Sequence, residues 1–314
     1  MEVVTLGEAM VLFVPDRAGL LRYANTFERY VAGAESNTAI GLARIGHKVG
    51  WISKVGTDEF GQYMLSFLRG EQVDVSQVKT DKEAPTGVFF KERRRTDSTR
   101  VYYYRAGSAA SRLTPEDLDH AYISQARYLH LTGITPALSA SCRASIHSCI
   151  EIANNAGVQI SFDPNLRLKL WPAAEAKAAF LNIIPHVQLV LTSEEEAELI
   201  TDTSDPEEAA RTILAMGPSQ VVIKQGAKGA LGVTKDALIF APALKVETIE
   251  TVGAGDAFNA GFLSGQLRGW NLADSLHLGN IMGAMATTVP GDVEGLPDWA
   301  EIQPYLGGNH PLER

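Results

Sequence analysis

Short apolar runs alternate with longer amphipathic segments through the second half of the chain. The apolar runs have the length of buried strands and lie at residues 128–131, 158–162, 189–191 and 221–224. The segments between them have helical spacing and lie at residues 141–156, 174–184, 194–200 and 206–216. This alternation predicts an α/β fold with a mostly parallel sheet flanked by helices. Ligands bind such sheets at the carboxyl ends of the strands, so residues that follow each strand are candidates for a site.

The N-terminal and C-terminal parts of the chain continue this pattern. Strands are predicted at residues 3–6 and 49–55, with a helix at 35–45 between them that Gly46 ends. Thr57 and Asp58 cap a further amphipathic helix that includes Leu68. The last long helices are predicted at residues 254–268 and 272–288.

A different pattern interrupts the alternation before residue 106. Residues 88–90 and 101–104 are β-branched or aromatic, and they enclose a charged run from Lys91 to Arg95 and the turn-forming Thr96-Asp97-Ser98. This arrangement predicts a β-hairpin. Together with residues 11–14 and the segment around Arg22-Tyr23, the hairpin is expected to form a small separate sheet.

Composition places the chain among ordinary globular proteins. It has 314 residues, of which 45% are hydrophobic and 21% charged. At about 150 residues per domain, this length fits two units or one large α/β domain with an appendage. The two cysteines, Cys142 and Cys149, form neither a disulfide framework nor a zinc pattern, and free thiols fit a reducing cytoplasm.

The charge balance narrows the classes of partner. Lys plus Arg number 28 and Asp plus Glu number 37, so the formal net charge is −9. Such a field repels nucleic acid and anionic membranes, so an anionic substrate would need cationic side chains gathered locally. No apolar run approaches the length of a membrane span, and no signal peptide is visible at the N-terminus.

The segment richest in chemistry is Gly253-Ala254-Gly255-Asp256. Two glycines at the start of a helix let backbone N–H groups approach an anion, and the helix dipole adds positive charge there. An ordinary glycine-opened helix gives the same pattern. A dinucleotide fingerprint fits poorly because its third glycine would fall at Phe258, and P-loop, Gly-x-Ser-x-Gly and His-Glu-x-x-His motifs are absent.

Three motifs together carry a family resemblance. They are Ala32-Gly33-Ala34-Glu35-Ser36-Asn37, Val55-Gly56-Thr57-Asp58-Glu59-Phe60-Gly61 and the Gly-Ala-Gly-Asp segment. The chain thereby resembles the ribokinase-like (phosphofructokinase B) carbohydrate kinases over nearly its whole length. The resemblance implies phosphoryl transfer from ATP to a sugar hydroxyl. It implies one three-layer kinase domain over 1–314, with lid strands at about 11–31 and 86–105 and a nucleotide-binding part at about 187–306.

The resemblance also implies roles for particular residues. Asp256 would be the catalytic base, and Gly253, Ala254 and Gly255 the anion hole. Glu196 would organise Mg2+ through water. The nucleotide would be bound by Ser193, Lys224, Gly226, Lys228, Gly229, Gly253, Gly255 and Asn280. Two positions depart from the family, because Ser193 replaces an Asn and Glu250 replaces an Asp near a cation site.

Two arginines suggest the kind of sugar. A sugar acid needs cations that match a carboxylate, and Arg105 and Arg167 each follow a strand-like run. A salt bridge in the lid and a helix-cap contact are the simpler interpretations of these arginines. With the surrounding Tyr-Tyr-Arg-Ala-Gly-Ser-Ala and Asp-Pro-Asn-Leu-Arg segments, the chain is similar to family members that phosphorylate 2-keto-3-deoxygluconate. The implied sugar contacts are Gly33, Asn37, Phe89 (often Tyr in the family), Tyr103, Arg105, Arg167, Asp256 and Asp292.

Other functions remain open at this point. A fructokinase shares most of these motifs, and a non-catalytic sugar or nucleotide sensor could use the same fold. An NAD-dependent oxidoreductase is disfavoured by the missing third glycine. The expected partners are ATP and a sugar acid, and a homo-oligomer is expected, with the lid as a dimer surface.

Overall fold

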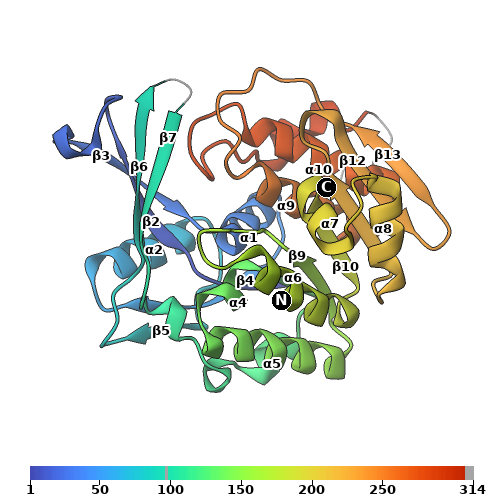
Figure 1. Ribbon diagram of the computed structural model, residues 1–314, viewed down its shortest axis with the longest axis horizontal. Helices are drawn as coiled ribbons and strands as arrows, with labels where there is room; N and C mark the ends of the chain where they lie inside the picture. Colours follow the sequence, from blue (N-terminus) through green and yellow to red (C-terminus); the bar gives the residue numbers. More distant parts are fainter. Residues whose placement is uncertain (96–97, 308–314) are drawn as a thin grey trace.

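The computed structural model describes residues 1–95 and 98–307. Within these residues a nine-stranded sheet has the order β13-β12-β11-β10-β9-β8-β1-β4-β5 (Figure 1). Its strands are β1 (Val3–Leu6), β4 (Val49–Gly56), β5 (Val78–Asp81), β8 (Tyr128–Thr132), β9 (Gln159–Asp163), β10 (Leu189–Ser193), β11 (Gln220–Lys224), β12 (Gly229–Thr234) and β13 (Leu238–Pro242). The run from β11 to β5 is parallel, and β12 and β13 join antiparallel at one edge. The predicted α/β class and mostly parallel sheet are confirmed.

The strands are apolar because both faces of the sheet are covered. Val3 packs in one core and its neighbour Val4 in the other, and all four residues of β1 are buried. Val222 and Val221 of β11 divide in the same way. Since successive side chains of a strand point to opposite faces, a doubly covered strand is mainly apolar, and Thr5 is the only polar residue of β1.

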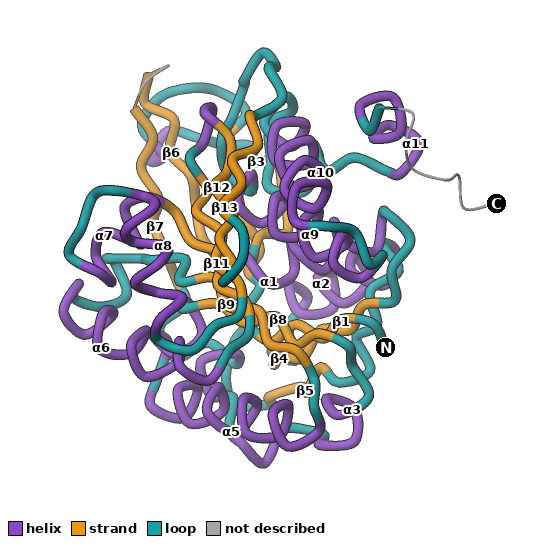
Figure 2. The backbone as a smooth tube through the Cα atoms, turned by 90° about the vertical axis from the view of Figure 1, so that its right-hand side faces the viewer, coloured by secondary structure: helices purple, strands orange, loops and turns teal. Residues whose placement is uncertain are grey.

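Helices form the outer layers on the two faces (Figure 2). The first face carries α1 (Ala34–Arg44), α2 (Glu59–Gly70), α9 (Ala254–Leu267), α10 (Leu272–Ala286) and α11 (Trp299–Ile302). The second carries α3 (His120–Ser124), α4 (Ile134–Leu138), α5 (Ala140–Ala156), α6 (Ala173–Ile183), α7 (Glu194–Thr201) and α8 (Pro206–Ala215). None of the helices in the described ranges is both long and apolar enough to cross a membrane.

A second sheet stands beside the large one in Figure 1, and we call it the small sheet. Its order is β3-β2-β6-β7, with β2 at Met10–Pro15, β3 at Phe27–Ala32, β6 at Val88–Arg95 and β7 at Ser98–Tyr104. The expected strand around Arg22-Tyr23 is wrong. These residues lie in a 3-10 helix at Leu21–Tyr23, and the strand follows them. Residues 96 and 97 of the predicted turn lie outside the described residues.

Small residues let α9 approach its neighbours closely. A Cβ on Gly261 would lie 2.7 Å from the carbonyl oxygen of Leu278 on α10, so no larger side chain fits there. On the other side, a Cβ on Gly41 of α1 would lie 2.9 Å from the Cβ of Ala260. This close packing draws the N-terminal ends of α1 and α9 together, although they are far apart in the sequence.

A buried carboxylate fixes α1 against the centre of the sheet. Glu35 is fully buried, and its Oε1 accepts hydrogen bonds from the hydroxyls of Thr132 at 2.6 Å and Thr135 at 2.9 Å. Burial raises the pKa of Glu35 to about 7. Gly7 directly follows β1, and a Cβ on it would lie 2.1 Å from the Glu35 carboxyl carbon. Gly7 therefore provides the space that this carboxyl group fills.

We expect Gly7→Ala to lower the free energy of unfolding by about 1–3 kcal/mol, because the Glu35 carboxyl cannot move without losing its threonine partners. Urea unfolding followed by circular dichroism measures the change. Gly70→Ala is the matched control, since Gly70 ends α2 with open space around its Cβ position. Equal stability of the two variants would contradict this account of Gly7.

Candidate active site

A cleft of about 1000 Å³ opens at the carboxyl ends of β9, β10 and β11. The registers of the parallel strands align Ser193 at the end of β10 with Lys224 at the end of β11, so both side chains reach the same edge. Predicted site residues that line this cleft are Arg167, Ser193, Glu196, Lys224, Gly226, Gly229, Gly253, Ala254, Gly255, Asp256 and Asn280. The sheet thus brings together residues that span more than a hundred positions of the sequence, from Arg167 to Asn280, at the edge where its parallel strands end.

Asp256 lies in the first turn of α9 and is only 7% exposed. Its Oδ2 accepts a hydrogen bond of 2.8 Å from Nδ2 of Asn37 on α1, and its Oδ1 a longer one of 3.5 Å from Nδ2 of Asn165. Gly253 precedes it with a φ of 78°, a left-handed conformation that favours glycine. We call residues 253–256 the glycine turn. It presents free backbone N–H groups and one carboxylate to the cleft.

The surroundings of Asp256 change its proton affinity. Burial raises the pKa of Asp256 to about 6, and the nearby negative charge of Asp163 acts in the same direction. The hydrogen bond from Asn37 and the positive charges of Arg167 and Lys224 oppose this rise. A carboxylate with this pKa is ionised at neutral pH and is a better proton acceptor than an ordinary aspartate.

Lys224 is held beside the glycine turn by two neighbours. Its Nζ donates to Oδ2 of Asp163 at 2.8 Å and to Oδ1 of Asn259 at 3.3 Å. Asn259, one turn along α9 from Asp256, also donates to the same Asp163 oxygen at 2.6 Å. A Cβ on Gly255 would lie 3.7 Å from the Lys224 ammonium, so the positive charge stands next to the anion hole.

Both side-chain oxygens of Glu196 accept hydrogen bonds from backbone N–H groups. Its Oε2 accepts from the backbone N–H of Ser193 at 2.9 Å, and its Oε1 from that of Leu166 at 2.7 Å. Burial raises the pKa of Glu196, and the charge of Asp163 adds to the effect. Within the described residues no cluster of three His, Cys, Asp or Glu side chains could hold a metal ion. The carboxylates of Asp163 and Glu196 both line the cleft, and oxygen donors of this kind are compatible with a Mg2+ ion that keeps most of its waters.

The other residues predicted to bind nucleotide divide into two groups. Gly226 and Gly229 form the turn between β11 and β12 and line the cleft. Asn280 also lines it, and its Nδ2 donates to the carbonyl oxygen of Ala241 at 2.9 Å. Lys228 is exposed and is not among the residues that line the cleft. It forms an ion pair of 3.2 Å with Glu194, which does line the cleft.

Six predicted sugar contacts, namely Gly33, Asn37, Phe89, Tyr103, Arg105 and Asp292, are not among the residues that line this cleft. Gly33 caps α1, and a Cβ on it would lie 2.6 Å from the carbonyl oxygen of Glu8, so glycine is required there. Phe89 is buried on the small sheet and stacks on Tyr103, with ring centroids 5.3 Å apart. Asp292 lies beside the glycine turn, because a Cβ on Gly253 would lie 2.4 Å from its carbonyl oxygen.

The two arginines have different surroundings. Arg105 is mostly buried and forms an ion pair with the buried Glu8, to which its Nε donates at 2.7 Å. The hydroxyl of Ser108 donates to the other Glu8 oxygen. Arg167 is exposed at the edge of the cleft, and among the described residues no carboxylate lies within ion-pair distance of its guanidinium. Arg167 is therefore the arginine with free donors.

Sequence reasoning did not single out Glu8, Asp163, Asn165 or Asn259. Asp163 ends β9 and Asn165 follows it, which is the position where a parallel sheet places its ligands, so that rule could have found them. Asn259 follows Asp256 by three residues and therefore shares its helix face. Nothing in the sequence pattern indicates that Glu8 would pair with a residue almost a hundred positions away.

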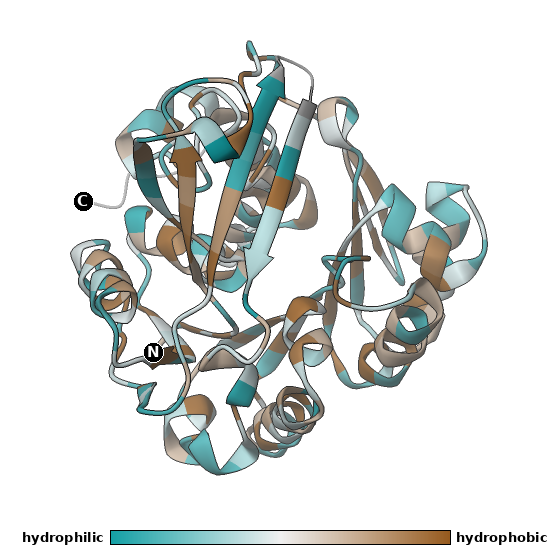
Figure 3. Cartoon of the chain, turned by 60° about the vertical axis from the view of Figure 1, so that its left-hand side comes forward, coloured by the Kyte–Doolittle hydropathy of each residue, from teal (hydrophilic) through white to brown (hydrophobic). Residues whose placement is uncertain are grey.

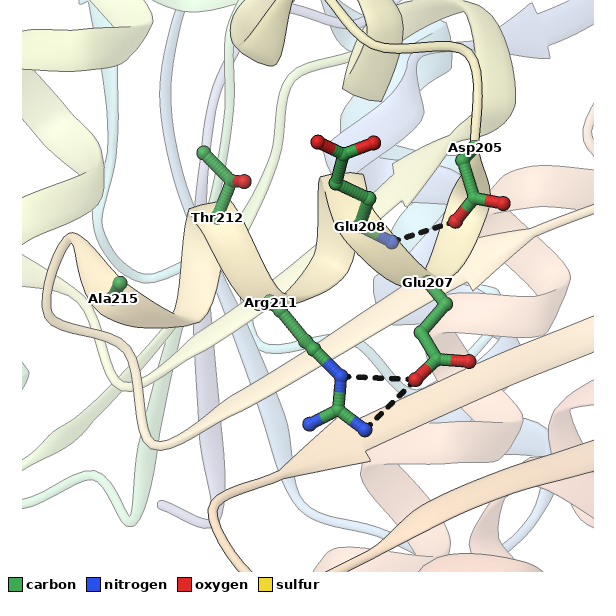
Figure 4. Close-up of a pocket in the computed structure, with 6 residues that line it drawn as sticks. All are labelled: Asp205, Glu207, Glu208, Arg211, Thr212 and Ala215. Carbon is green, nitrogen blue, oxygen red and sulfur yellow. Dashed lines mark hydrogen bonds and ion pairs between the residues drawn. The ribbon is translucent and has the colours of Figure 1, made fainter.

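A second, shallower hollow of about 480 Å³ lies on the outer face of α8 (Figure 4). Its polar groups serve their own helix. Arg211 pairs with Glu207 at 2.9 Å, and Asp205 caps the helix by accepting from the backbone N–H of Glu208 at 2.8 Å. These contacts explain the residues without a ligand.

Comparison with known proteins supports the family resemblance. The chain matches the pfkB family carbohydrate kinase over residues 1–299. A 2-dehydro-3-deoxygluconokinase of Bacillus subtilis (strain 168) is 38% identical over 317 residues, covering 100% of this chain and 98% of that protein. A protein of the same name from Thermoproteus tenax is 38% identical, with 96% and 93% covered. Fructokinase-2 of Zea mays is 32% identical, with 97% and 93% covered.

Solved structures agree in fold. A PfkB protein from Polaromonas sp. JS666 superposes with a TM-score of 0.89 and 39% identity, covering 96% of this chain and 99% of that one. A protein from E. coli in complex with ATP and Mg2+ superposes with a TM-score of 0.91 and 25% identity, covering 97% and 98%. With a match along nearly its whole length and such relatives, the chain belongs to the pfkB family of carbohydrate kinases.

Proposed function

We propose that the protein transfers the γ-phosphoryl group of ATP to the terminal hydroxyl of 2-keto-3-deoxygluconate (2-dehydro-3-deoxygluconate). The product is 2-keto-3-deoxy-6-phosphogluconate. The observation that carries the proposal is the buried Asp256 carboxylate, held by Asn37 at the mouth of a glycine-opened helix inside the cleft. The choice of sugar acid is supported by the names of the two relatives that are 38% identical.

The chemistry follows from the geometry of the glycine turn. The γ-phosphoryl group would lie against the N-terminal N–H groups of α9 and the ammonium of Lys224, both of which stabilise negative charge. The sugar hydroxyl attacks phosphorus while the bond to the β-phosphate oxygen breaks, and ADP leaves. Asp256 accepts the hydroxyl proton as the new bond forms, which suits a loose transition state. Mg2+, where bound, neutralises charge on the phosphates.

The sugar acid would be recognised at the other end of the cleft. Arg167 lines the cleft and has free donors, so its planar guanidinium suits the carboxylate of the sugar acid. Tyr103, stacked on Phe89, offers a flat surface and a hydroxyl on the small sheet. Arg105 would contribute only its remaining donors, because Glu8 already accepts from its Nε.

Fructose phosphorylation is the second candidate, and one observation favours it. The pairing of Arg105 with Glu8 cancels one of the two positive charges that a sugar carboxylate would use. A neutral sugar is bound by side chains that hydrogen-bond its hydroxyl groups and needs no net positive charge. The Zea mays fructokinase is 32% identical to this chain. The two candidates therefore differ in how much the enzyme gains from Arg167.

We expect Asp256→Asn to lower kcat by about 10²–10⁴-fold while ATP still binds, because the amide cannot accept the proton. In the unaltered enzyme, kcat/KM should fall as the pH drops below about 6, where Asp256 becomes protonated. A coupled ADP-release assay measures both effects. Asp236→Asn, in an exposed turn, is the control and should match the parent enzyme. A near-normal rate for Asp256→Asn would reject the assignment of the base.

Among 2-keto-3-deoxygluconate, fructose, ribose and 2-keto-gluconate, we expect the first to have the highest kcat/KM. Arg167→Ala should raise its KM about 10–100-fold, since a hydrogen bond to a charged group is worth about 1.5–3 kcal/mol. The KM for fructose should change little. Arg100→Ala removes an exposed arginine of the small sheet as a control. Faster turnover of fructose by the parent enzyme would reject the sugar acid.

We also propose a homodimer through the outer face of the small sheet. Aromatic side chains gather there, with Phe13 stacked on Phe90 at 5.2 Å between ring centroids and Phe27 and Phe60 packed against Phe13. Figure 3 brings the small sheet forward, and its strand β6 is hydrophobic at the base and hydrophilic toward the hairpin tip. An exposed aromatic patch is typical of an interaction surface, and a second copy offers a matching one.

Light scattering with size-exclusion chromatography should give a dimer for the parent chain. Phe27→Glu should shift it to a monomer, because a charge would be buried without a partner. Phe240→Glu is the control, since Phe240 is an exposed aromatic residue, 51% accessible, on the edge strand β13. A monomeric parent, or a dimer that survives Phe27→Glu, would contradict the proposal.

A further inference from the structure

Lys91 lies on the inner face of the small sheet, although it belongs to a run of charged residues. Side chains alternate along β6, so Lys91 shares a face with Phe89, which is buried in the apolar cluster of this sheet. Its pairing partner on β7 is Val101, whose side chain packs against the same cluster. The side chain of Lys91 is only 12% exposed. A charge this buried needs a partner.

The partner of Lys91 is Glu250, which belongs to the large domain. The two side chains form an ion pair, and Glu250 is itself 19% exposed. Glu250 lies in the loop between β13 and α9, three residues before the glycine turn. The pair therefore links the small sheet to the loop that leads directly into the phosphate-binding segment.

Further contacts connect Glu250 to the glycine turn. Its backbone N–H donates to the carbonyl oxygen of Thr287 at 3.1 Å, at the end of α10. Its Oε2 accepts from the backbone N–H of Gly291 at 3.3 Å. The next residue, Asp292, abuts Gly253, where a Cβ would lie 2.4 Å from the Asp292 carbonyl oxygen. A continuous series of contacts thus runs from Lys91 through Glu250 and Gly291 to the left-handed turn at Gly253.

The pKa of Asp292, which lies beside the glycine turn, also depends on Lys91. Burial raises the pKa of Asp292 to about 7, the charge of Asp256 acts in the same direction, and Lys91 opposes them. Burial lowers the pKa of Lys91 itself. Without the ammonium of Lys91, Asp292 would lose the positive charge that opposes this rise, and Glu250 would lose its ion-pair partner. The loop before the glycine turn would then hold a mostly buried carboxylate without a cationic partner, which is costly.

A second lysine, Lys169 in the loop after β9, also contacts the small sheet. Nζ of Lys169 donates to the backbone carbonyl oxygen of Val101 at 3.2 Å and lies 5.6 Å from the centre of the Tyr103 ring. Lys169 is exposed, and its partner is neutral. The ion pair of Lys91 is thus the charged and more buried of these two contacts, and it reaches the glycine turn while Lys169 does not.

We propose that Lys91 is a positioning residue for phosphoryl transfer: its ion pair with Glu250 orders the loop before the glycine turn when the small sheet covers the cleft. Lys91 touches neither the sugar nor the phosphates in this role. Because of this ion pair, the glycine turn takes its correct shape at the same time as the small sheet covers the cleft. The inference rests on the proposed chemistry of the glycine turn, but not on the identity of the sugar.

The test compares kcat and KM for Lys91→Met, Lys91→Arg, Glu250→Gln and the Lys91→Met/Glu250→Gln double variant. The probe is 2-keto-3-deoxygluconate, or fructose if the parent enzyme turns it over faster, so failure of the sugar-acid proposal leaves this test intact. We expect kcat to fall about tenfold in Lys91→Met and in Glu250→Gln, because a small displacement of a catalytic group is costly. The KM of the sugar should change less than twofold, and Lys91→Arg should keep most of the activity.

The double variant shows whether Lys91 and Glu250 act through their ion pair or independently of each other. If the two residues act only through each other, it should be no slower than the slower single variant. Arg93→Met is the matched control, because it removes an exposed positive charge two positions along the same face of β6, and its kcat should equal that of the parent. Unchanged kcat in Lys91→Met, or multiplicative losses in the double variant, would overturn the proposal. If Lys91→Met does not fold, the kcat of Glu250→Gln is compared with that of Lys91→Arg. An unchanged kcat in Glu250→Gln then overturns the proposal.

Discussion

The hydrogen bond between Asn37 and Asp256 is the contact on which the site depends. It joins the first turns of two helices that are 219 residues apart in the sequence, and it is buried. It requires that α1 and α9 pack closely, which the small residues Gly41 and Ala260 allow. It also requires that the carboxylate remain ionised in a poorly hydrated place, where a good donor offsets part of the loss of water. The fold thus creates a proton acceptor by placing an aspartate where its charge is costly.

An acidic protein that handles anions must concentrate its positive charge. The net charge is −9, and acidic side chains also line the cleft, yet Lys224, Arg167 and the open end of α9 place positive charge beside the glycine turn. Asp163 and Asn259 hold the lysine in place, so that its charge is already directed at the glycine turn. Preorganised charge of this kind stabilises a transition state more than mobile surface lysines would, because nothing has to reorient during the reaction.

The fold was predictable where burial leaves a strong local pattern. A doubly covered strand such as β11 has a continuous apolar centre, Val221-Val222-Ile223, and the helices between such strands have clear periodicity. The edge strands β12 and β13 were not predicted, because β12 contains two glycines and β13 alternates with exposed positions. β3 was misplaced onto Arg22-Tyr23 because its first three residues are exposed and do not alternate with buried ones.

The site was predictable only in its local part. The glycine turn is contiguous in the sequence, so its chemistry could be recognised there. The partners of Asp256 come from distant elements: Asn37 on α1, which only the family resemblance indicated, and Asn165 after β9. Lys91 belongs to a run of charges that looks like any solvated strand, and only the position of the small sheet against the cleft gives this lysine a partner.

The pair of Glu8 and Arg105 constrains how this protein can change over evolution. Both side chains are buried, and removing one partner would leave an isolated charge in the interior, a loss of about 3–5 kcal/mol. Single replacements at either position are therefore expected to be selected against, whatever their effect on substrate choice. A lineage that exchanges one sugar for another by altering Arg105 must pass through a coordinated replacement at Glu8, which makes these two positions a coupled unit of divergence within the family.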